Sequence, residues 1–148
     1  MTDNENELNE KQKIEHLKQW LDSLPLKANI HLIGLTSEGG VHSHLNHLKK
    51  LIEIIQSQSS KKIFIHAISD GRDTAPNIAQ DTLSVLKAEI ESETTKFSSL
   101  SGRFYAMDRD KRWKRTQSYY QMLTKPPQKT TDLKDIIQSN YINNTLDE

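Results

Sequence analysis

The chain has 148 residues, of which 34% are hydrophobic and 27% are charged, and its 20 basic and 20 acidic side chains give a formal net charge of zero. A balanced charge argues against a dedicated nucleic-acid-binding protein, and the absence of cysteine excludes disulfide scaffolds, thiolate catalysis and zinc–cysteine sites. No apolar run approaches the roughly 20 residues that span a bilayer, and the first ten residues carry four acids and no base, unlike a targeting peptide. We therefore expect a cytoplasmic protein that binds neither nucleic acid nor membrane.

The apolar residues recur with the periods of helices and strands. A helical pattern begins at Glu10 and stops at Pro25, so we expect residues 1–25 to be an acidic tail with an N-terminal helix, and residues 26–148 to be a separate unit. After a solvated tail over residues 1–9, the patterns predict helices over residues 10–24, 41–55, 79–90, 113–123 and 133–137. Between the first four helices they predict a buried strand over residues 28–35, a strand over residues 62–68 and a short strand over residues 97–100. This order predicts an α/β fold, a layered domain with a mainly parallel sheet and flanking helices.

Each predicted strand leads into a polar loop, and the three loops cover residues 36–44, 69–76 and 100–115. In α/β folds ligands bind outside the carboxyl ends of the strands, so we expect the three loops to form one site. The third loop carries six basic side chains against Asp108 and Asp110. Arginine offers a planar fork of donors that matches carboxylate and phosphate oxygens. The pattern therefore favours a small anion as the ligand.

The first loop contains two glycines and two histidines, and a third histidine follows it at position 47. Gly39 and Gly40 precede a predicted helix and could offer backbone N–H groups to a phosphate, although two glycines are more often only a turn. On a helix, His42 and His44 would point roughly 200° apart, so together with His47 they do not predict a metal site. His42, at the mouth of the helix, is the candidate for contacting a phosphate or acting as an acid.

The second loop places two carboxylates and a guanidinium within four residues, from Asp70 to Asp73. One interpretation is a turn closed by the Asp70 side chain, with a local salt bridge. The other is functional: Arg72 binds an anion and Asp73 moves a proton from an alcohol. The spacing alone leaves both open.

Two further groups of residues have a structural and a functional interpretation. The segment 112–115 resembles a nucleic-acid patch in composition, but such a segment is more often a solvated helix face with its aromatic residue, here Trp113, turned inward. His31 and His66 lie within apolar runs. We expect them to be histidines at the edge of the core, each with a satisfied hydrogen bond.

Taken together, the three loops resemble those of the cofactor-independent phosphoglycerate mutases. The matching stretches are Ser-Glu-Gly-Gly-Val-His-Ser-His, Ser-Asp-Gly-Arg-Asp-Thr-Ala-Pro and Ser-Gly-Arg-Phe-Tyr-Ala-Met-Asp-Arg-Asp-Lys-Arg-Trp. The resemblance is strong over about residues 30–123 and weaker over residues 131–148. Two departures are Glu38, where the family usually has Asp, and Ala75, where it often has Pro.

The resemblance implies a role for each matching residue. His42 would meet the phosphate of the substrate, and Arg72, Arg103 and Arg109 would bind its anionic groups. Asp73 would serve as general base and acid on the hydroxyl groups of the glycerate. These roles suit 3-phosphoglycerate, whose carboxylate and phosphate call for charge-assisted hydrogen-bond donors.

The resemblance also implies parts that we do not find in this sequence. Members of the family have a phosphatase-like domain that holds two divalent metals, manganese or magnesium, and a serine that is transiently phosphorylated. We find no such nucleophile or metal motif, so we expect no metal in this chain. We interpret it as the substrate-binding part of an isomerase of glycolysis and gluconeogenesis that interconverts 3-phosphoglycerate and 2-phosphoglycerate.

Without the phosphatase-like part, the chain is expected to be a fragment that is inactive by itself. A complementary phosphatase-like chain is then a partner to consider. The alternatives are a non-catalytic phosphoglycerate-binding module and an inert or protein-interaction fragment.

Overall fold

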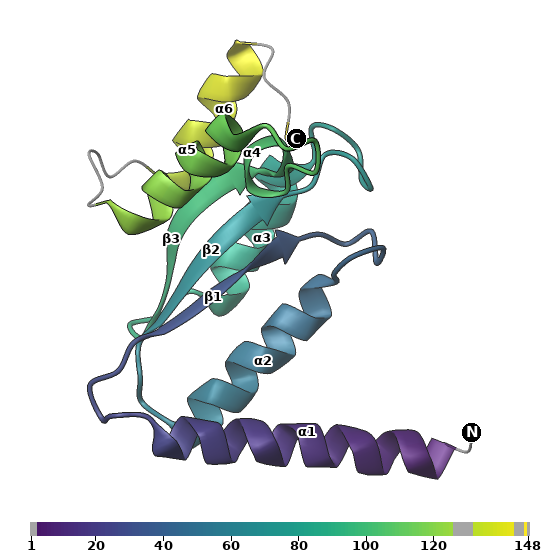
Figure 1. Cartoon of the computed structure of the whole chain (residues 1–148), viewed down its shortest axis with the longest axis vertical. Coiled ribbons are helices and arrows are strands. Elements are labelled where there is room, and N and C mark those ends of the chain that lie inside the picture. The colour runs from purple at the N-terminus through teal and green to yellow at the C-terminus, as the bar shows by residue number, and fades with distance from the viewer. Residues whose placement is uncertain (1–2, 126–131, 144–146, 148) are drawn as a thin grey trace.

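The structure, a computed structural model, describes residues 3–125, 132–143 and 147 (Figure 1). Helices and strands alternate through its first part, and three helices follow the last strand. In chain order the elements are α1 (Asp3–Ser23), β1 (Ile30–Thr36), α2 (Leu45–Gln58), β2 (Ile63–Ser69), α3 (Ala79–Ile90), β3 (Thr95–Gly102), α4 (Arg103–Ala106), α5 (Trp113–Thr124) and α6 (Leu133–Ile142). The predicted α/β class is confirmed, whereas the short helix α4 was not anticipated.

The three strands are parallel and lie in the order β1-β2-β3, so that β2 is central. Their last residues, Thr36, Ser69 and Gly102, lie opposite one another across the sheet. The polar loops that follow the strands therefore start at the same edge of the sheet. This placement is the one that the sequence predicts.

A bulge interrupts the pairing of β3 with β2. Phe97 lies opposite Ile65, but the next pair joins Ser99 to His66, so that Ser98 is one residue more than β2 can match. The bulge takes up this residue. The last residues of the two strands consequently stay level.

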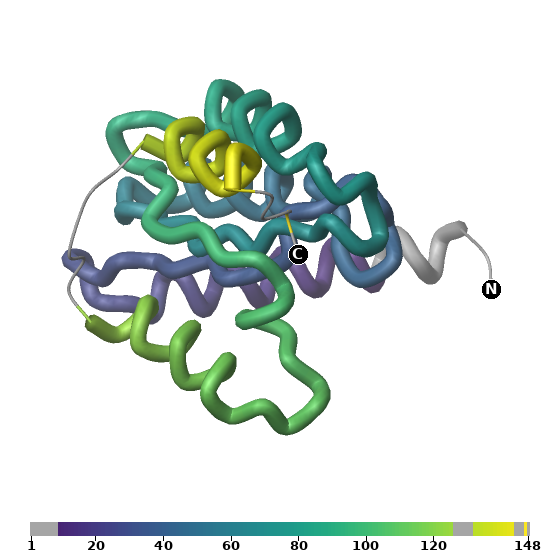
Figure 2. The backbone as a smooth tube through the Cα atoms, turned by 90° about the horizontal axis from the view of Figure 1, so that it is seen from above, coloured from purple at the N-terminus to yellow at the C-terminus, as the bar shows by residue number. Residues whose placement is uncertain are grey.

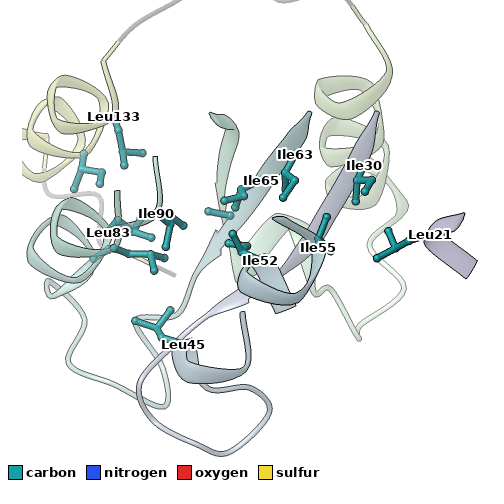
Figure 3. Packing of buried hydrophobic residues seen from close by; sticks show 14 residues of the cluster. Leu21, Ile30, Leu45, Ile52, Ile55, Ile63, Ile65, Leu83, Ile90 and Leu133 are labelled. Carbon is teal, nitrogen blue, oxygen red and sulfur yellow. The ribbon is translucent and has the colours of Figure 1, made fainter. Parts of the chain in front are cut away.

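The hydrophobic core is centred on β2, where Phe64 alone among the seven residues is not fully buried. Two helices bury an apolar stripe against the sheet, as Figure 3 shows from close by. The buried residues are Leu45, Ile52 and Ile55 of α2 and Ala79, Leu83, Leu86 and Ile90 of α3. Each set repeats at the three- and four-residue spacing of one helix face, which is why the sequence predicted both helices.

Two of the three helices that follow β3, α5 and α6, lie on opposite sides of the sheet. Figure 2 shows α6 beside α3 on one side and α5 on the other. Leu133 and Ile137 of α6 join the core, whereas α5 has no buried residue. The side of the sheet that faces α3 is therefore the more completely covered one.

Two helix starts and the place of one strand differ from the prediction. α1 begins at Asp3, so helical backbone replaces most of the expected tail, and α2 begins at Leu45 rather than at residue 41. β1 is an edge strand instead of a fully buried one, and Ile33 at its middle is 57% exposed.

Leu21 of α1 lies in the same core cluster as the rest of the chain. The division of the chain at residue 25 stays a prediction.

The orientation of α5 is the reverse of the one expected from its sequence. Trp113, which was expected to turn inward, is 72% exposed, and Tyr120 is 65% exposed. The partly buried stripe contains Arg115, Tyr119 and Leu123, which follow one another at four-residue spacing. The contacts of Arg115, given below, account for this orientation.

Candidate functional site

A cleft of about 290 Å³ lies at the carboxyl edge of the sheet. Its lining comes from all three polar loops and from α4 and α5, and consists of His42, Arg72, Arg103, Phe104, Met107, Asp108, Arg109, Asp110 and Arg115. Four of the five predicted site residues are in this lining. The fifth, Asp73, contacts two of them. The folding of the chain thus brings together residues from three distant parts of the sequence.

Asp70, the first residue after β2, connects the three loops. It is only 4% exposed. Its Oδ1 accepts hydrogen bonds from the backbone N–H groups of Arg72 (3.2 Å) and Asp73 (2.9 Å) and from Nη1 of Arg103 (2.6 Å), and its Oδ2 accepts one from the hydroxyl of Ser37 (2.5 Å). Burial by itself would raise the pKa of Asp70, but the hydrogen bonds, led by that of Ser37, outweigh it and lower the pKa below its ordinary value.

These contacts bear on the two interpretations of the 70–73 segment. The Asp70 side chain closes a turn on the backbone of Arg72 and Asp73, as the structural interpretation predicts. The turn fixes the backbone on which both site residues are carried. Proton transfer by Asp73 stays a prediction.

Arg103, the residue after β3, is held between two carboxylates. Its Nη1 donates to Asp70 Oδ1 at 2.6 Å and to Asp73 Oδ2 at 2.8 Å, and its side chain is 9% exposed. Burial alone would lower the pKa of Arg103, but the two carboxylates outweigh it and raise the pKa further. Arg103 is therefore a permanent cation that joins the second loop to the third.

Asp73 lies beside the cleft and is partly exposed. Its side chain is 19% exposed, and Oδ2 lies 3.7 Å from Nε2 of His42, whose side chain is 55% exposed. The guanidinium of Arg103 donates a hydrogen bond to this carboxylate at 2.8 Å. Residue spacing along the chain did not indicate this contact, because it joins positions that are 30 residues apart.

The first loop packs directly against the second one. A Cβ atom on Gly39 would lie 2.9 Å from the backbone oxygen of Asp73 and 3.2 Å from the Ser37 hydroxyl, so only glycine fits without a shift. Gly40 has a φ of +68°, which also favours glycine. Because α2 begins only at Leu45, the two glycines do not form its first turn. Their observed role is to let two loops meet.

The three histidines near α2 do not converge on one point. His42 lies in the loop before α2, so the helical spacing assumed for it does not apply, while His44 is the N-cap of the helix and accepts the N–H of Asn46 at 3.2 Å. Within the part of the chain that the structure describes, no group of three or more His, Asp or Glu side chains could hold a metal ion.

His31 and His66 form the hydrogen bonds that were expected of them. Nδ1 of His31 lies 2.9 Å from Nε2 of His66, and Nδ1 of His66 lies 2.8 Å from the hydroxyl of Ser99. Burial, together with the neighbouring His31, lowers the pKa of His66. These contacts belong to the sheet and lie outside the lining of the cleft.

The third loop is held by contacts that the sequence interpretation missed. The Asp108 side chain is only 2% exposed and accepts the backbone N–H of Arg112 at 2.8 Å and Nη1 of Arg115 at 3.4 Å. The guanidinium carbon of Arg115 lies 3.5 Å above the centre of the Phe104 ring, close enough for a cation–π contact. The seven-residue separation of Asp108 and Arg115 gave no signal, because a loop and a helix start lie between them.

Arg109 is presented by the loop that these contacts hold. Its side chain is exposed at the cleft, and it makes no hydrogen bond or ion pair with any other residue in the described ranges 3–125, 132–143 and 147. Arg103 and Arg115, in contrast, each donate to a carboxylate. Arg109 is thus the arginine of the lining best able to give its donors to an incoming anion.

Comparison with known proteins places this chain in a family. A family model described as the BPG-independent PGAM N-terminus matches residues 3–148. This chain belongs to that family. The predicted resemblance to cofactor-independent phosphoglycerate mutases is thereby confirmed.

Two bacterial relatives show how much of a phosphoglycerate mutase the chain covers. It is 46% identical over 121 residues to the 2,3-bisphosphoglycerate-independent phosphoglycerate mutase of Aliarcobacter butzleri. The matched stretch covers 81% of this chain and 24% of that relative. The chain is 41% identical over 139 residues to the enzyme of that name from Campylobacter jejuni, which covers 94% of this chain and 27% of the relative. The chain spans about a quarter of the length of these phosphoglycerate mutases.

A solved structure of a phosphoglycerate mutase also resembles the fold. The crystal structure of the Leishmania mexicana enzyme at low cobalt concentration matches 81% of this chain and 24% of that chain, with a TM-score of 0.68 and 27% sequence identity. The described helices of this phosphoglycerate mutase family member include none that is long and apolar enough to cross a membrane.

Proposed function

We propose that this chain is the substrate-binding part of a phosphoglycerate mutase that interconverts 3-phosphoglycerate and 2-phosphoglycerate in the cytoplasm. The observation that supports this best is the convergence of His42, Arg72 and Arg109 on one cleft beside the Asp73 carboxylate. A ligand with a carboxylate at one end and a phosphate at the other needs several cationic donors around a small space. It also needs a group that can exchange a proton with a hydroxyl between them.

Each site residue has a role in this proposal. Arg109 and Arg72 bind the carboxylate and phosphate oxygens, and His42, whose side chain is 55% exposed, meets the phosphate. Arg103 contributes whatever donors its two carboxylate contacts leave, and it holds the Asp73 carboxylate in position. Asp73 accepts a proton from the attacking hydroxyl of the glycerate and returns one to the leaving oxygen.

The phosphoryl transfer itself is assigned to a part that this chain does not supply. In the proposed reaction a phosphoserine on a phosphatase-like domain carries the phosphoryl group, and two divalent metals, manganese or magnesium, support that transfer there. The described residues of this chain offer no metal-binding group. We therefore expect purified chain, incubated with 3-phosphoglycerate and manganese, to form no 2-phosphoglycerate. Steady formation by a preparation free of host mutase would contradict this division of labour.

Binding is the direct test of the proposal. Isothermal titration of the chain with 3-phosphoglycerate and with 2-phosphoglycerate should give a dissociation constant of about 1 mM or below, which corresponds to about −4 kcal/mol. Arg109→Ala should weaken binding about tenfold or more, since a hydrogen bond to a charged group contributes about 1.5–3 kcal/mol. Lys114→Ala, a basic residue of α5 outside the lining, serves as the matched control and should bind like wild type.

Two alternatives differ from the proposal in measurable ways. A non-catalytic phosphoglycerate-binding module would show the same binding, but adding a phosphatase-like chain would yield no turnover. An inert or protein-interaction fragment would give no heat with either phosphoglycerate. Equal loss of binding in Arg109→Ala and Lys114→Ala would point to general charge attraction rather than to the cleft.

A further inference from the structure

Asp147 makes four hydrogen bonds, three of which are to residues at least 68 positions away in the chain. It is 5% exposed. Its backbone N–H donates to the backbone oxygen of Pro76 at 3.0 Å, and its backbone oxygen accepts the hydroxyl of Ser69 at 2.6 Å. Its Oδ2 accepts the N–H of Ala79 at 2.8 Å, and its Oδ1 accepts the hydroxyl of Tyr141. Three parts of the chain, β2, α3 and α6, are thereby connected through one residue.

The two backbone contacts lie on either side of the second polar loop. Ser69 is the last residue of β2 and directly precedes Asp70, while Pro76 lies at the other end of the loop. Between these two points the chain carries Arg72 and Asp73. Inside the loop, the Asp70 carboxylate accepts backbone N–H groups, but nothing in those contacts fixes the far end at Pro76.

The carboxylate of Asp147 fixes the start of the following helix. Ala79 is the first residue of α3, whose N-cap position is Ile78, and Ile78 makes no side-chain cap hydrogen bond. A carboxylate that accepts an N–H at this end also interacts favourably with the helix dipole. Asp147 therefore supplies from a distant part of the sequence the cap that the local sequence lacks.

We propose that Asp147 is a positioning residue that joins the two ends of the 70–76 loop and so holds Arg72 and Asp73 at the cleft. The inference rests on the proposed function only in its consequence for phosphoglycerate binding. Its structural part is independent of any ligand: the side-chain contacts with Ala79 and Tyr141 hold the backbone of Asp147 against Ser69 and Pro76, so without them the loop and the first turn of α3 open more often. The loop then spends less time in the arrangement in which the two side chains face the cleft.

The test compares amide hydrogen exchange and ligand binding in the full chain. Asp147→Ala removes both side-chain contacts, Asp147→Asn keeps an acceptor oxygen of the same shape, and Asp81→Ala removes another acid from the first turn of α3 as the matched control. Exchange of the backbone amides of residues 71–75 is followed by mass spectrometry, at a temperature where circular dichroism shows every variant folded. Affinity for 3-phosphoglycerate is measured by calorimetry at the same temperature.

We expect Asp147→Ala to speed exchange of the loop amides about tenfold and to weaken 3-phosphoglycerate binding by a similar factor. Asp147→Asn should recover most of both, and Asp81→Ala should leave both within about twofold of wild type. Loop exchange that is unchanged in Asp147→Ala, or that rises equally in Asp81→Ala, would overturn the inference.

Two other outcomes are also decisive. If Asp147→Ala does not fold, Tyr141→Phe, which removes only the contact with Oδ1, is measured instead and should raise loop exchange in the same segment; an unchanged loop would count against the inference. If wild-type chain does not bind 3-phosphoglycerate, the proposed function fails, while the exchange data still decide the role of Asp147.

Discussion

Nη1 of Arg103 lies 2.8 Å from Oδ2 of Asp73, so a cation of the cleft is already paired with the carboxylate proposed to move a proton. An anionic ligand that approaches Arg103 must therefore share it with Asp73 and meets the negative charge of that carboxylate. The pairing has a cost for binding and a benefit for chemistry. It fixes the position of the Asp73 carboxylate beside the cleft.

Asp73→Asn should separate these two effects. The amide keeps an oxygen for Arg103 but removes the charge that repels the ligand, so we expect the affinity for 3-phosphoglycerate to stay unchanged or to rise. In a mixture reconstituted with a phosphatase-like chain, the same variant should lower turnover by about 10²–10⁴-fold, as for loss of a general acid–base. Calorimetry and a coupled assay measure the two. A loss of affinity as large as that of Arg109→Ala would show that Asp73 binds the ligand directly.

A pair of glycine substitutions tests the packing of the first loop on the second. Gly39→Ala should cost about 1–3 kcal/mol of unfolding free energy, because its Cβ would lie 2.9 Å from the backbone oxygen of Asp73. It should also weaken phosphoglycerate binding by displacing Asp73. Gly34→Ala is the control, since nothing lies within 4 Å of its Cβ position. Urea denaturation gives both free energies, and equal stability of the two variants would be inconsistent with the close approach.

The pKa of Asp70 predicts how the fold responds to acid. Because the folded-state pKa is lowered, the ionised carboxylate stabilises the fold above its unfolded pKa of about 3.9, and this stabilisation is lost as the pH falls through the folded-state value. Asp70→Asn should therefore cost about 3 kcal/mol at pH 7, as expected when a buried ion pair is broken. The difference from wild type should shrink as urea denaturation is repeated between about pH 5 and pH 3. A difference that is constant across this range would exclude the carboxylate charge as its cause.

Arg115 is expected to position the loop that presents Arg109. Arg115→Lys keeps the charge but loses the planar group that stacks on Phe104 and donates to Asp108. We expect faster amide exchange in residues 108–112 and about tenfold weaker 3-phosphoglycerate binding. Arg112→Lys is the control, because the contact of Arg112 with Asp108 uses its backbone N–H. If both variants behave like wild type, the stacking does not determine the loop.

The sequence predicted the parts of the fold that depend on local periodicity. α3 was placed at its observed bounds because its apolar residues repeat along one helix face, and β1 and β2 were placed within one or two residues because each is a short apolar run. The end of each strand was also recognisable from the polar residues that follow it. Since parallel strands end at one edge, this was enough to bring His42, Arg72 and Arg103 to one place.

What the sequence could not indicate are pairings between distant positions. Asp70 appeared only as a turn residue, although it accepts hydrogen bonds from all three loops, and its partners Ser37 and Arg103 each lie 33 residues away. Helix α5 was turned the wrong way because Trp113 is more apolar than Arg115. The guanidinium of Arg115 contacts Asp108 and Phe104 across the third loop. The periodicity of apolar residues carries no information on such contacts.

The bulge in β3 lets the strand lose one residue without moving Arg103, which a regular strand would not allow. Ser98 is the extra residue of the bulge. A strand without it would still pair Ser99 with His66 and Gly102 with Ser69, so Arg103 would still lie beside Asp70. Removing any other single residue of β3 beyond the bulge could be compensated by straightening the same point. The position of Arg103 is therefore buffered against a change of one residue in strand length, which in a regular strand would shift it by about 3.3 Å.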